Sequence, residues 1–497
     1  MRRQSLNFKL VFRTIGFLLL LVGMAMFTAL PFSWYFHPEG INDYTIMSAS
    51  SDFFPLLLSG IITIITGIIT LIITRKAHKN TTKKEGYLIV SLSWVMISVF
   101  GALPFYLSGY FGSYTNAFFE TMSGFTTTGS SILIDIESIP HGLLFWRSLT
   151  HWIGGMGIIV LSLAILPLLG IGGMQMFSAE APGPTTDKIH PKVREMAKRL
   201  WAIYVLLTFA QTILLMLGDM SFFNAICHSM ATMATGGFST QNTSIVGFSP
   251  YIQYIIILFM IMAGTNFALH YYLLKRKFSK VSQNQEYRMY LGIIVIVSLI
   301  ITVGLIAQKH IGIEKAFRDS LFQVVSILTT TGFVSADYLL WPTSLWMILF
   351  MLFFIGGSAG STGGGVKVIR ILVLIKNSLL EFRRLLHPQA ILPVRFNHKP
   401  LPNKIVFVVI SFFLFYISTF AIGAVVMTFF GLDFQSAIGA SASSLGNVGP
   451  AIGSLGPVEN YAHLPDGGKW FLSFLMLLGR LEIFTVLIIF SPSFWRK

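Results

Sequence analysis

Four short stretches rich in threonine and glycine interrupt an otherwise strongly apolar sequence. Their central glycines are Gly129, Gly236, Gly332 and Gly449, and the intervals between them are 107, 96 and 117 residues. Irregular backbone at membrane depth persists only where protein or a water-filled path surrounds it, because lipid leaves its polar groups unsatisfied. Four such loops that meet on one axis could replace the hydration shell of a cation with main-chain carbonyl oxygens. The pattern therefore predicts coordination of a dehydrated monovalent cation.

Each loop is expected to contribute four consecutive residues to a cation filter. Its glycine lets the backbone turn carbonyls towards the axis without a Cβ clash, and the β-branched residue before the glycine is stiff at χ1. The predicted filter residues are Thr127, Thr128, Gly129 and Ser130; Ala234, Thr235, Gly236 and Gly237; Thr330, Thr331, Gly332 and Phe333; and Asn447, Val448, Gly449 and Pro450. One such loop would carry little information, whereas four at matched positions form a specific signal.

A second glycine-rich stretch lies where the third unit should cross the membrane. Each glycine inside a helix costs roughly 1 kcal/mol, so we expect an unwound loop on the cytoplasmic side of the third filter loop, where it could act as a gate. The alternative is a face of small residues that packs against another helix. The predicted gate residues are Gly356, Gly357, Ser358, Ala359, Gly360, Ser361, Thr362, Gly363, Gly364 and Gly365, together with Arg480.

Arg480 lies deep within the last apolar segment, 11 residues from Lys469 and 11 from Ser491. Ionisable groups at such depth face the protein interior and mark ion paths. Our hypothesis is that Arg480 donates to carbonyls of the Gly356–Gly365 loop and adds an electrostatic barrier below the filter. Glu482 is two positions further on and projects in another direction, so a local salt bridge is not expected. The alternative is a purely structural role for the arginine.

Four other basic residues receive plainer interpretations. Lys367 and Arg370 follow the glycine-rich stretch, and we expect them to reach the cytoplasmic interface through their long side chains. Arg147 and His151 begin a span near the outer face, where we expect them to act as interfacial anchors beside tryptophans. The histidines lack the spacing of a metal site and Cys227 is the single cysteine, so no transition metal is predicted.

Composition places the chain in a membrane. It is 54% hydrophobic and 11% charged, with a mean hydropathy of +0.72, whereas soluble domains are about 25% charged. The length accommodates about ten spans of about 20 residues each, besides shorter segments that dip into the membrane and return. The sequence has no Walker loop, dinucleotide fingerprint or nucleophile motif, so this chain is not expected to bind a nucleotide or to be an enzyme.

The spans and loops follow one repeating order. The expected fold is an all-α integral membrane protein with four covalently linked span–pore-helix–span repeats around a central pore, preceded by two extra transmembrane helices. A pore helix too short to cross the bilayer can aim its negative C-terminal end inward and favour cations. The predicted pore segments are Tyr114–Thr126, Phe222–Ala234, Lys315–Thr329 and Phe434–Leu445. The predicted divisions are residues 1–85 for the two extra helices and 86–175, 176–285, 286–390 and 391–497 for the repeats.

Charge fixes the expected topology. The formal net charge is +15, and the basic residues cluster between alternate apolar runs while the intervening segments are acidic. This alternation follows the positive-inside rule and places both termini in the cytoplasm. The excess of basic residues therefore reflects membrane topology and does not indicate binding of nucleic acid. The first apolar stretch, Leu10–Phe36, is too long for the h-region of a signal peptide, and we interpret it as an uncleaved span.

Three motifs add a family resemblance. WIGGMGIIVL at Trp152–Leu161, GGSAGSTGGGVKVIR at Gly356–Arg370 and GRLEIFT at Gly479–Thr485 resemble the Trk/Ktr/HKT superfamily of potassium uptake proteins, most of all its bacterial Trk-type membrane subunits. The resemblance covers essentially the whole chain. It implies K⁺ as the transported ion and a multi-pass protein of the bacterial inner membrane.

The resemblance also implies partners and roles. It implies a homodimer with one pore in each subunit, and a cytoplasmic, nucleotide-binding (TrkA-like) regulatory ring on the basic inner face. The Gly356–Gly365 loop would be the intramembrane gate, held by Arg480. Plant relatives that prefer sodium carry serine at the first filter glycine, so Gly129 favours potassium.

Several functional alternatives stay open at this point. Conduction as a gated channel is favoured over proton- or sodium-coupled symport, because Glu482 is nearly the only acidic residue within a predicted span. A secondary carrier would show two inverted repeats, whereas these four have the same orientation. A membrane-embedded enzyme would need buried carboxylates or a histidine cluster at a cavity, and the spans contain almost none.

Overall fold

The structure is a computed structural model that describes residues 6–36, 52–76, 82–160 and 189–496, without the side chains of residues 158–160 and 189–194. The predicted division at 175/176 and the end of the motif at Trp152–Leu161 lie outside the described residues. The divisions predicted at 85/86 and 285/286 cut the first turns of helices that begin at Lys83 and Gln285.

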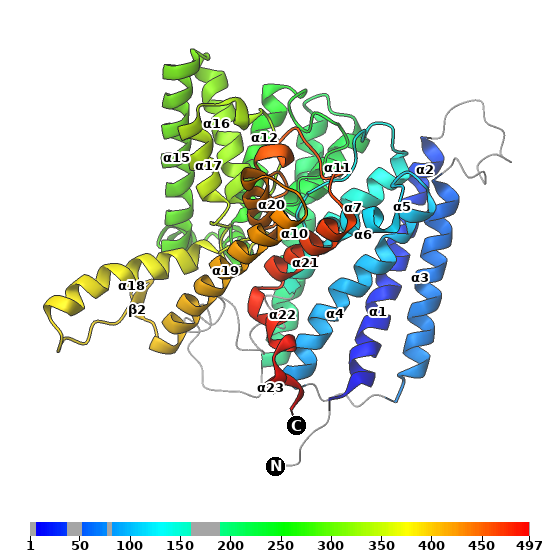
Figure 1. Cartoon of the computed structure of the whole chain (residues 1–497), viewed down its shortest axis with the longest axis horizontal. Helices are drawn as coiled ribbons and strands as arrows, with labels where there is room; N and C mark the ends of the chain where they lie inside the picture. Colours follow the sequence, from blue (N-terminus) through cyan, green and yellow to red (C-terminus); the bar gives the residue numbers. More distant parts are fainter. Residues whose placement is uncertain (1–5, 37–51, 77–81, 161–188, 497) are drawn as a thin grey trace.

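Helices follow one another in the predicted order (Figure 1). The leading pair is α1 (Phe8–Phe27), extended by α2 (Leu30–Tyr35), and α3 (Phe53–Ile73). The first repeat has α4 (Lys83–Gly101), α5 (Leu103–Leu107), α6 (Tyr114–Phe125) and α7 (His141–Val160); the second has α10 (Ile189–Met216), α11 (Phe222–Met233), α12 (Pro250–Gly264), α13 (Phe267–Leu274) and the short α14 (Phe278–Ser282).

The other two repeats carry additional short elements. The third has α15 (Gln285–Lys309), α16 (Ile313–Leu328), η4 (Tyr338–Leu340), α17 (Thr343–Leu352), α18 (Val368–Leu386) and a two-residue antiparallel pair, β1 (Arg395–Phe396) and β2 (Lys399–Pro400). The fourth has α19 (Asn403–Phe429), α20 (Phe434–Gly446), η5 (Gly453–Leu455), α21 (Asp466–Arg480), α22 (Ile483–Phe490) and α23 (Pro492–Trp495). The predicted all-α fold is confirmed.

Apolar residues cover the outside of this fold, as lipid requires. Six described helices are long and apolar enough to cross a membrane, and two further bent helix pairs reach the same criterion together. On α3, isoleucines that include Ile65, Ile69 and Ile72 are exposed. The pore helices α6, α11, α16 and α20 are instead buried, with many serines and threonines among their buried residues. Polar groups inside and apolar groups outside identify a multi-pass membrane protein.

Three of the four pore helices begin at polar caps. The side chains of Ser113 and Ser221 accept hydrogen bonds from backbone N–H groups in the first turns of α6 and α11, and Asp433 does the same for α20. Such caps satisfy N–H groups that have no partner within the helix. In α16 the cap residue is Gly312, and Glu314 lies in the first turn. A negative charge at this end of a helix interacts favourably with the helix dipole.

In three of the four repeats, the span that follows the pore helix is broken. Helices α12 and α13 meet at 103° and α21 and α22 at 117°, so neither pair forms one continuous helix. Thr265 is extended between the first pair, and Glu482 has a positive φ of 58° between the second. In the third repeat, a non-helical segment from residue 353 to 367 separates α17 from α18, as the glycine-rich sequence predicted.

Both ends of the described chain lie on one face of the molecule. The backbone N–H of Asn7 donates to Glu85 Oε1 at 2.9 Å, and Lys84 Nζ donates to the carbonyl of Arg496 at 3.0 Å. The starts of α1 and α4 and the end of α23 therefore lie together, at the bottom of Figure 1.

Candidate functional site

The four pore helices end with the same hydrogen-bond pattern. At each end, one backbone N–H donates to the carbonyl five residues earlier, which satisfies a terminal carbonyl of the helix. The pairs are Thr128 to Ser123 (2.8 Å), Gly236 to Ala231 (2.8 Å), Thr331 to Ser326 (2.8 Å) and Val448 to Ser443 (3.0 Å). The residue before each donor is left-handed; these residues are Thr127, Thr235, Thr330 and Asn447, with φ of 52°, 54°, 58° and 55°. The pattern aligns the four loops residue by residue.

This alignment corrects the predicted register of the second loop. The residue equivalent to Gly129 is Gly237, with a positive φ of 79°, and not Gly236. Ala234, predicted as a filter residue, is the C-cap of α11, and Phe238 takes the place that Ser130 has in the first loop. Two adjacent glycines follow Thr235. The prediction aligned Thr235 and Gly236 with Thr128 and Gly129, and this alignment placed the second loop one residue out of register.

The loops meet in a closed ring. A Cβ atom built on each aligned glycine would lie closer than 3.0 Å to a carbonyl oxygen of the next loop, which is closer than real Cβ atoms come. Each glycine therefore allows one loop to touch the carbonyl of its neighbour. The contacts run from Gly129 to Gly236, from Gly237 to Thr331, from Gly332 to Val448 and from Gly449 to Thr128. We call the carbonyls of Thr128, Gly236, Thr331 and Val448 the carbonyl ring.

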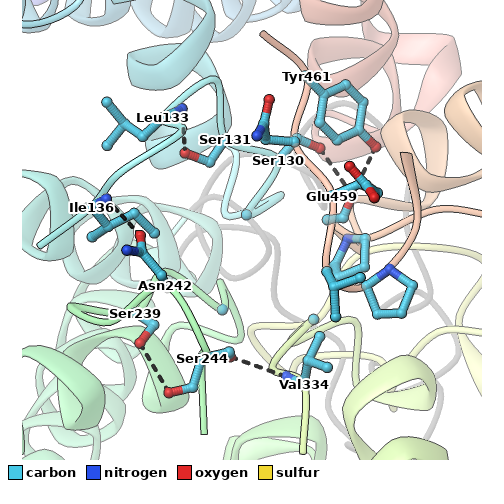
Figure 2. Close-up of a pocket in the computed structure, with 18 of the residues that line it drawn as sticks. Ser130, Ser131, Leu133, Ile136, Ser239, Asn242, Ser244, Val334, Glu459 and Tyr461 are labelled. Atoms are coloured by element: carbon cyan, nitrogen blue, oxygen red, sulfur yellow. Dashed lines mark hydrogen bonds between the residues drawn. The ribbon is translucent and has the colours of Figure 1, made fainter. Parts of the chain in front are cut away.

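A hollow opens on one side of the carbonyl ring, and we call it the outer mouth (Figure 2). All four aligned glycines line it, together with residues that follow them in each repeat, such as Ser130 and Val334. Glu459 and Tyr461, from the chain between α20 and α21, also line it. Chain segments from all four repeats therefore surround one opening.

The carbonyl of Gly449 is engaged in hydrogen bonds of its own. It accepts from Ser130 Oγ at 3.1 Å, from Ser443 Oγ at 2.8 Å and from the hydroxyl of Tyr461 at 2.9 Å. The ring contact of the fourth loop is instead made by the carbonyl of Val448. The predicted residue Asn447 supports the loop from behind, because its Nδ2 donates to Thr128 Oγ1 and to the carbonyl of Met476, both at 2.9 Å.

The predicted gate segment, Gly356–Gly365, is a buried non-helical loop that we call the intramembrane loop. The N–H of Gly364 donates to Thr330 Oγ1 at 2.6 Å, and Thr362 Oγ1 donates to the carbonyl of Met233 at 3.0 Å. These contacts are with residues that precede the ring in their loops, whereas the outer mouth is lined by residues at and after the aligned glycines. The intramembrane loop therefore lies on the opposite side of the carbonyl ring from the outer mouth.

Arg480 holds this loop from the last span. Its Nη1 donates to the carbonyl of Thr362 at 2.7 Å and its Nη2 to the carbonyl of Gly154 at 3.1 Å. The expected hydrogen bond from Arg480 to the loop is therefore present. The side chain is only 2% exposed, and it makes no salt bridge with any described carboxylate. Its positive charge therefore lies on the same side of the carbonyl ring as the intramembrane loop.

The interpretation of Lys367 and Arg370 as interfacial residues is wrong. Arg370 is buried and forms a salt bridge from Nη2 to Glu482 Oε2 at 2.5 Å. Lys367 Nζ donates to the carbonyl of Gly363 within the intramembrane loop. The break between α21 and α22 turns Glu482 towards α18, which a continuous helix would not do.

Sequence reasoning missed Glu286, which lies in the first turn of α15. Its Oε1 accepts from the N–H of Ala359 at 2.6 Å, so a buried carboxylate touches the intramembrane loop. The signal in the sequence was weak, because Glu286 lies within a polar run, from Ser282 to Arg288, that precedes the apolar sequence of α15.

Arg147 and His151 are not interfacial anchors, and this interpretation is also wrong. Both are buried. Arg147 Nε pairs with Glu120 Oε1 at 2.7 Å, and the ring of His151 stacks on that of Phe238, with 3.9 Å between centroids. Both residues therefore lie behind the loops that form the carbonyl ring.

Buried pore helices, apolar spans and a closed carbonyl ring define a helical membrane protein with four similar repeats around one central path. Comparison with known proteins agrees with this class. The chain belongs to the TrkH family, because the family model described as "Cation transport protein" matches residues 55–497. This family comprises transporters and not enzymes.

Individual relatives cover most of the chain. It is 43% identical to the Trk system potassium uptake protein TrkH of Escherichia coli strain K12, over 85% of this chain and 88% of that protein. It is 37% identical to TrkH of Halomonas elongata, over 99% and 100%. The crystal structure of the potassium transporter TrkH from Vibrio parahaemolyticus matches with a TM-score of 0.89 at 35% identity, over 99% of this chain and 100% of that one.

Proposed function

We propose that this chain takes up potassium ions across a bacterial inner membrane, and that the ions pass through the carbonyl ring. The observation that carries the proposal is the closure of four loops into one ring, where each aligned glycine touches the carbonyl of the next repeat. Carbonyl oxygens in such a ring can replace the hydration shell of a monovalent cation. The relatives named as potassium uptake proteins support K⁺ as the cation.

The intramembrane loop is the proposed gate. It lies below the ring and is held by Arg480, Glu286 and Thr330. An unpaired buried cation beside the path raises the energy of a second cation there. Displacement of the loop and of Arg480 would therefore open the path. The hydrogen bonds that Arg480 donates to the carbonyls of Thr362 and Gly154 would keep the path closed.

Regulation and assembly follow the family resemblance. We propose that the face that carries the starts of α1 and α4 is cytoplasmic, in keeping with the positive-inside rule. Exposed basic residues such as Lys275, Arg276 and Lys277 suit the docking of a nucleotide-binding, TrkA-like regulatory ring, and the working unit would be a homodimer. Co-purification with such a regulator, and the mass of the detergent-solubilised protein, test these two points.

Ion flux into liposomes tests the central proposal. Purified protein should shift the membrane potential towards the K⁺ equilibrium potential under a K⁺ gradient, and much less under an equal Na⁺ gradient. A Gly237→Ala variant, which places a Cβ against the Thr331 carbonyl, serves as a control with a blocked ring. Equal responses to K⁺ and Na⁺, or a wild-type response from this variant, would refute passage through a selective ring.

Coupled transport is the second candidate, and Glu286 is the observation that favours it. A buried carboxylate in contact with the intramembrane loop could exchange a proton or Na⁺ as the loop moves. In the same liposomes, a pH or Na⁺ gradient alone would then drive K⁺ uptake, and Glu286→Gln would abolish that drive. A channel would not respond to either gradient.

A further inference from the structure

A buried ion pair lies directly behind the filter loops. Glu120 is on α6, seven residues before the left-handed Thr127, and Arg147 is on α7. Arg147 Nε and Glu120 Oε1 are 2.7 Å apart, and the two side chains are 3% and 0% exposed. Glu120 does not line the outer mouth, and Arg147 lines it without contributing a carbonyl to the ring, so the proposed conduction mechanism leaves this pair without a role.

The carboxylate of Glu120 holds the chain that leaves the first filter loop. Its Oε1 accepts from Ser131 Oγ and its Oε2 from the N–H of Ile132, both at 2.9 Å. Ser131 and Ile132 follow Gly129 by two and three residues. A shift of this carboxylate would therefore move the segment that anchors Gly129 in the ring.

The guanidinium of Arg147 holds the corresponding segment of the second loop. Its Nη1 donates to the carbonyl of Ser239 at 2.9 Å, and its central carbon lies 3.5 Å from the centroid of the Phe238 ring. His151 stacks on the same ring at 3.9 Å. Two groups so close to the centroid cannot share one face, so Phe238, the residue after Gly237, is clamped between Arg147 and His151.

On three of the four pore helices, the side chain at the same position holds the chain that leaves the loop, each with different chemistry. The residues seven positions before the left-handed residue are Glu120, His228, Gln323 and Ala440. His228 Nε2 bonds Ser239 Oγ at 3.0 Å, and Gln323 Nε2 donates to the carbonyl of Ala336 at 3.1 Å. The alanine of the fourth repeat can form no such bond, and Tyr461 instead reaches the Gly449 carbonyl. The first repeat therefore supplies the charged member of the set.

Bonds between neighbouring repeats close a girdle around the outer side of the ring, and Figure 2 shows the one between Ser244 and Val334. Arg147 joins the first repeat to the second through Ser239. The N–H of Val334 joins the third to the second through Ser244 Oγ at 3.2 Å. The remaining links are Tyr338 hydroxyl to the Ala451 carbonyl at 2.7 Å and Tyr461 N–H to the Ser131 carbonyl at 2.9 Å.

We propose that Glu120 and Arg147 are positioning residues for the carbonyl ring, and that their ion pair sets the K⁺ over Na⁺ preference of the path. This inference rests on the proposed function. A buried pair need not add net stability, but the loss of one partner leaves an uncompensated buried charge, which forces its surroundings to rearrange. Here the surroundings are the exits of two filter loops. Their displacement would loosen the ring at the first and second repeats, so Na⁺ would be accommodated better.

Reversal potentials in liposomes that contain the full chain test this inference. Glu120→Gln keeps the side-chain size and one acceptor oxygen but removes the negative charge. Arg147→Lys keeps the positive charge but removes the planar guanidinium with its several N–H donors. Both should still carry K⁺, while the K⁺/Na⁺ permeability ratio falls roughly tenfold, which corresponds to about 1.4 kcal/mol of preference. Glu314→Gln is the matched control, because it removes the exposed carboxylate of an ion pair on α16, and its ratio should equal that of the wild type.

The outcomes separate this inference from the proposed function. A wild-type protein without K⁺ flux or selectivity would refute the function itself. Folded, conducting single variants with the wild-type ratio would refute the positioning role alone. Should both single variants fail to fold, the neutral pair Glu120→Gln with Arg147→Met removes both charges together and is measured in their place. A reduced K⁺/Na⁺ permeability ratio in that double variant supports the inference. A wild-type ratio overturns it, and so does failure of the double variant to fold, which would show that the pair is needed for folding.

Discussion

Arg480 and Thr362 are 118 residues apart in sequence, and a hydrogen bond of 2.7 Å joins the guanidinium of one to the carbonyl of the other. The broken last span and the intramembrane loop are therefore connected below the carbonyl ring. A second bond, to the Gly154 carbonyl, extends this connection to α7. One buried cation thus ties together the first, third and fourth repeats.

Replacement of Arg480 by alanine should raise unregulated K⁺ flux. The variant loses two charge-assisted hydrogen bonds, each worth about 1.5–3 kcal/mol, and removes the positive charge beneath the ring. We expect K⁺ efflux from loaded liposomes to increase severalfold without a regulator. Arg383→Ala, which removes an exposed charge on α18, should leave the efflux unchanged. Unchanged conductance and gating in Arg480→Ala would end its assignment as part of the gate.

Gly237→Ala should disable the ring, whereas Gly247→Ala should be tolerated. Gly237 has a positive φ of 79°, which costs a residue with a Cβ roughly 1–2 kcal/mol, and its Cβ would meet the Thr331 carbonyl. Gly247 lies in a loop, where a new Cβ would find no atom closer than 3.7 Å. Flux assays and thermal unfolding in detergent measure both variants. Normal flux through Gly237→Ala would contradict the structural register of the second loop.

Much of the site could be predicted because its signals are local. Glycine-rich loops that follow short capped segments located the pore helices to within one or two residues. The glycine run Gly356–Gly365 predicted the intramembrane loop, because glycine disfavours a helix. These features depend on backbone preference and need no knowledge of distant contacts.

Errors arose where a distant partner decides the structure. The break at Glu482 allows the pair with Arg370, which lies 112 residues earlier. Arg147 looked like an interfacial residue because Glu120 lies on another helix. The sequence did contain a signal for this ion pair, because Glu120 and Arg147 carry opposite charges in the two segments that flank the first loop. In the second loop, two adjacent glycines left the register ambiguous, and the hydrogen bond from Gly236 to Ala231 and the positive φ of Gly237 resolve it.

Loss of either Arg370 or Glu482 should destabilise the fold more than loss of both. Their salt bridge joins α18 to the break before α22, and both side chains are largely shielded from solvent. Removal of one partner of a buried pair costs about 3–5 kcal/mol, whereas replacement of both by apolar groups is often neutral. We therefore expect Glu482→Gln to lower the unfolding temperature in detergent, and the added change Arg370→Met to recover most of the loss. An additive effect of the two changes would show that the residues act separately.

Glu459→Gln should reduce K⁺ entry at low salt only. Glu459 lines the outer mouth, and its carboxylate makes no salt bridge with a described residue, so its field can concentrate cations there. A unit charge about 10 Å away in water contributes about 0.4 kcal/mol, so the expected decrease is on the order of twofold. Screening shortens the Debye length from about 30 Å at 0.01 M to about 10 Å at 0.1 M, so the decrease should vanish as ionic strength rises. Glu314→Gln, which also removes an exposed carboxylate but lies outside the mouth, should show no decrease at either salt concentration. An equal decrease at both concentrations would indicate a structural change instead of an electrostatic one.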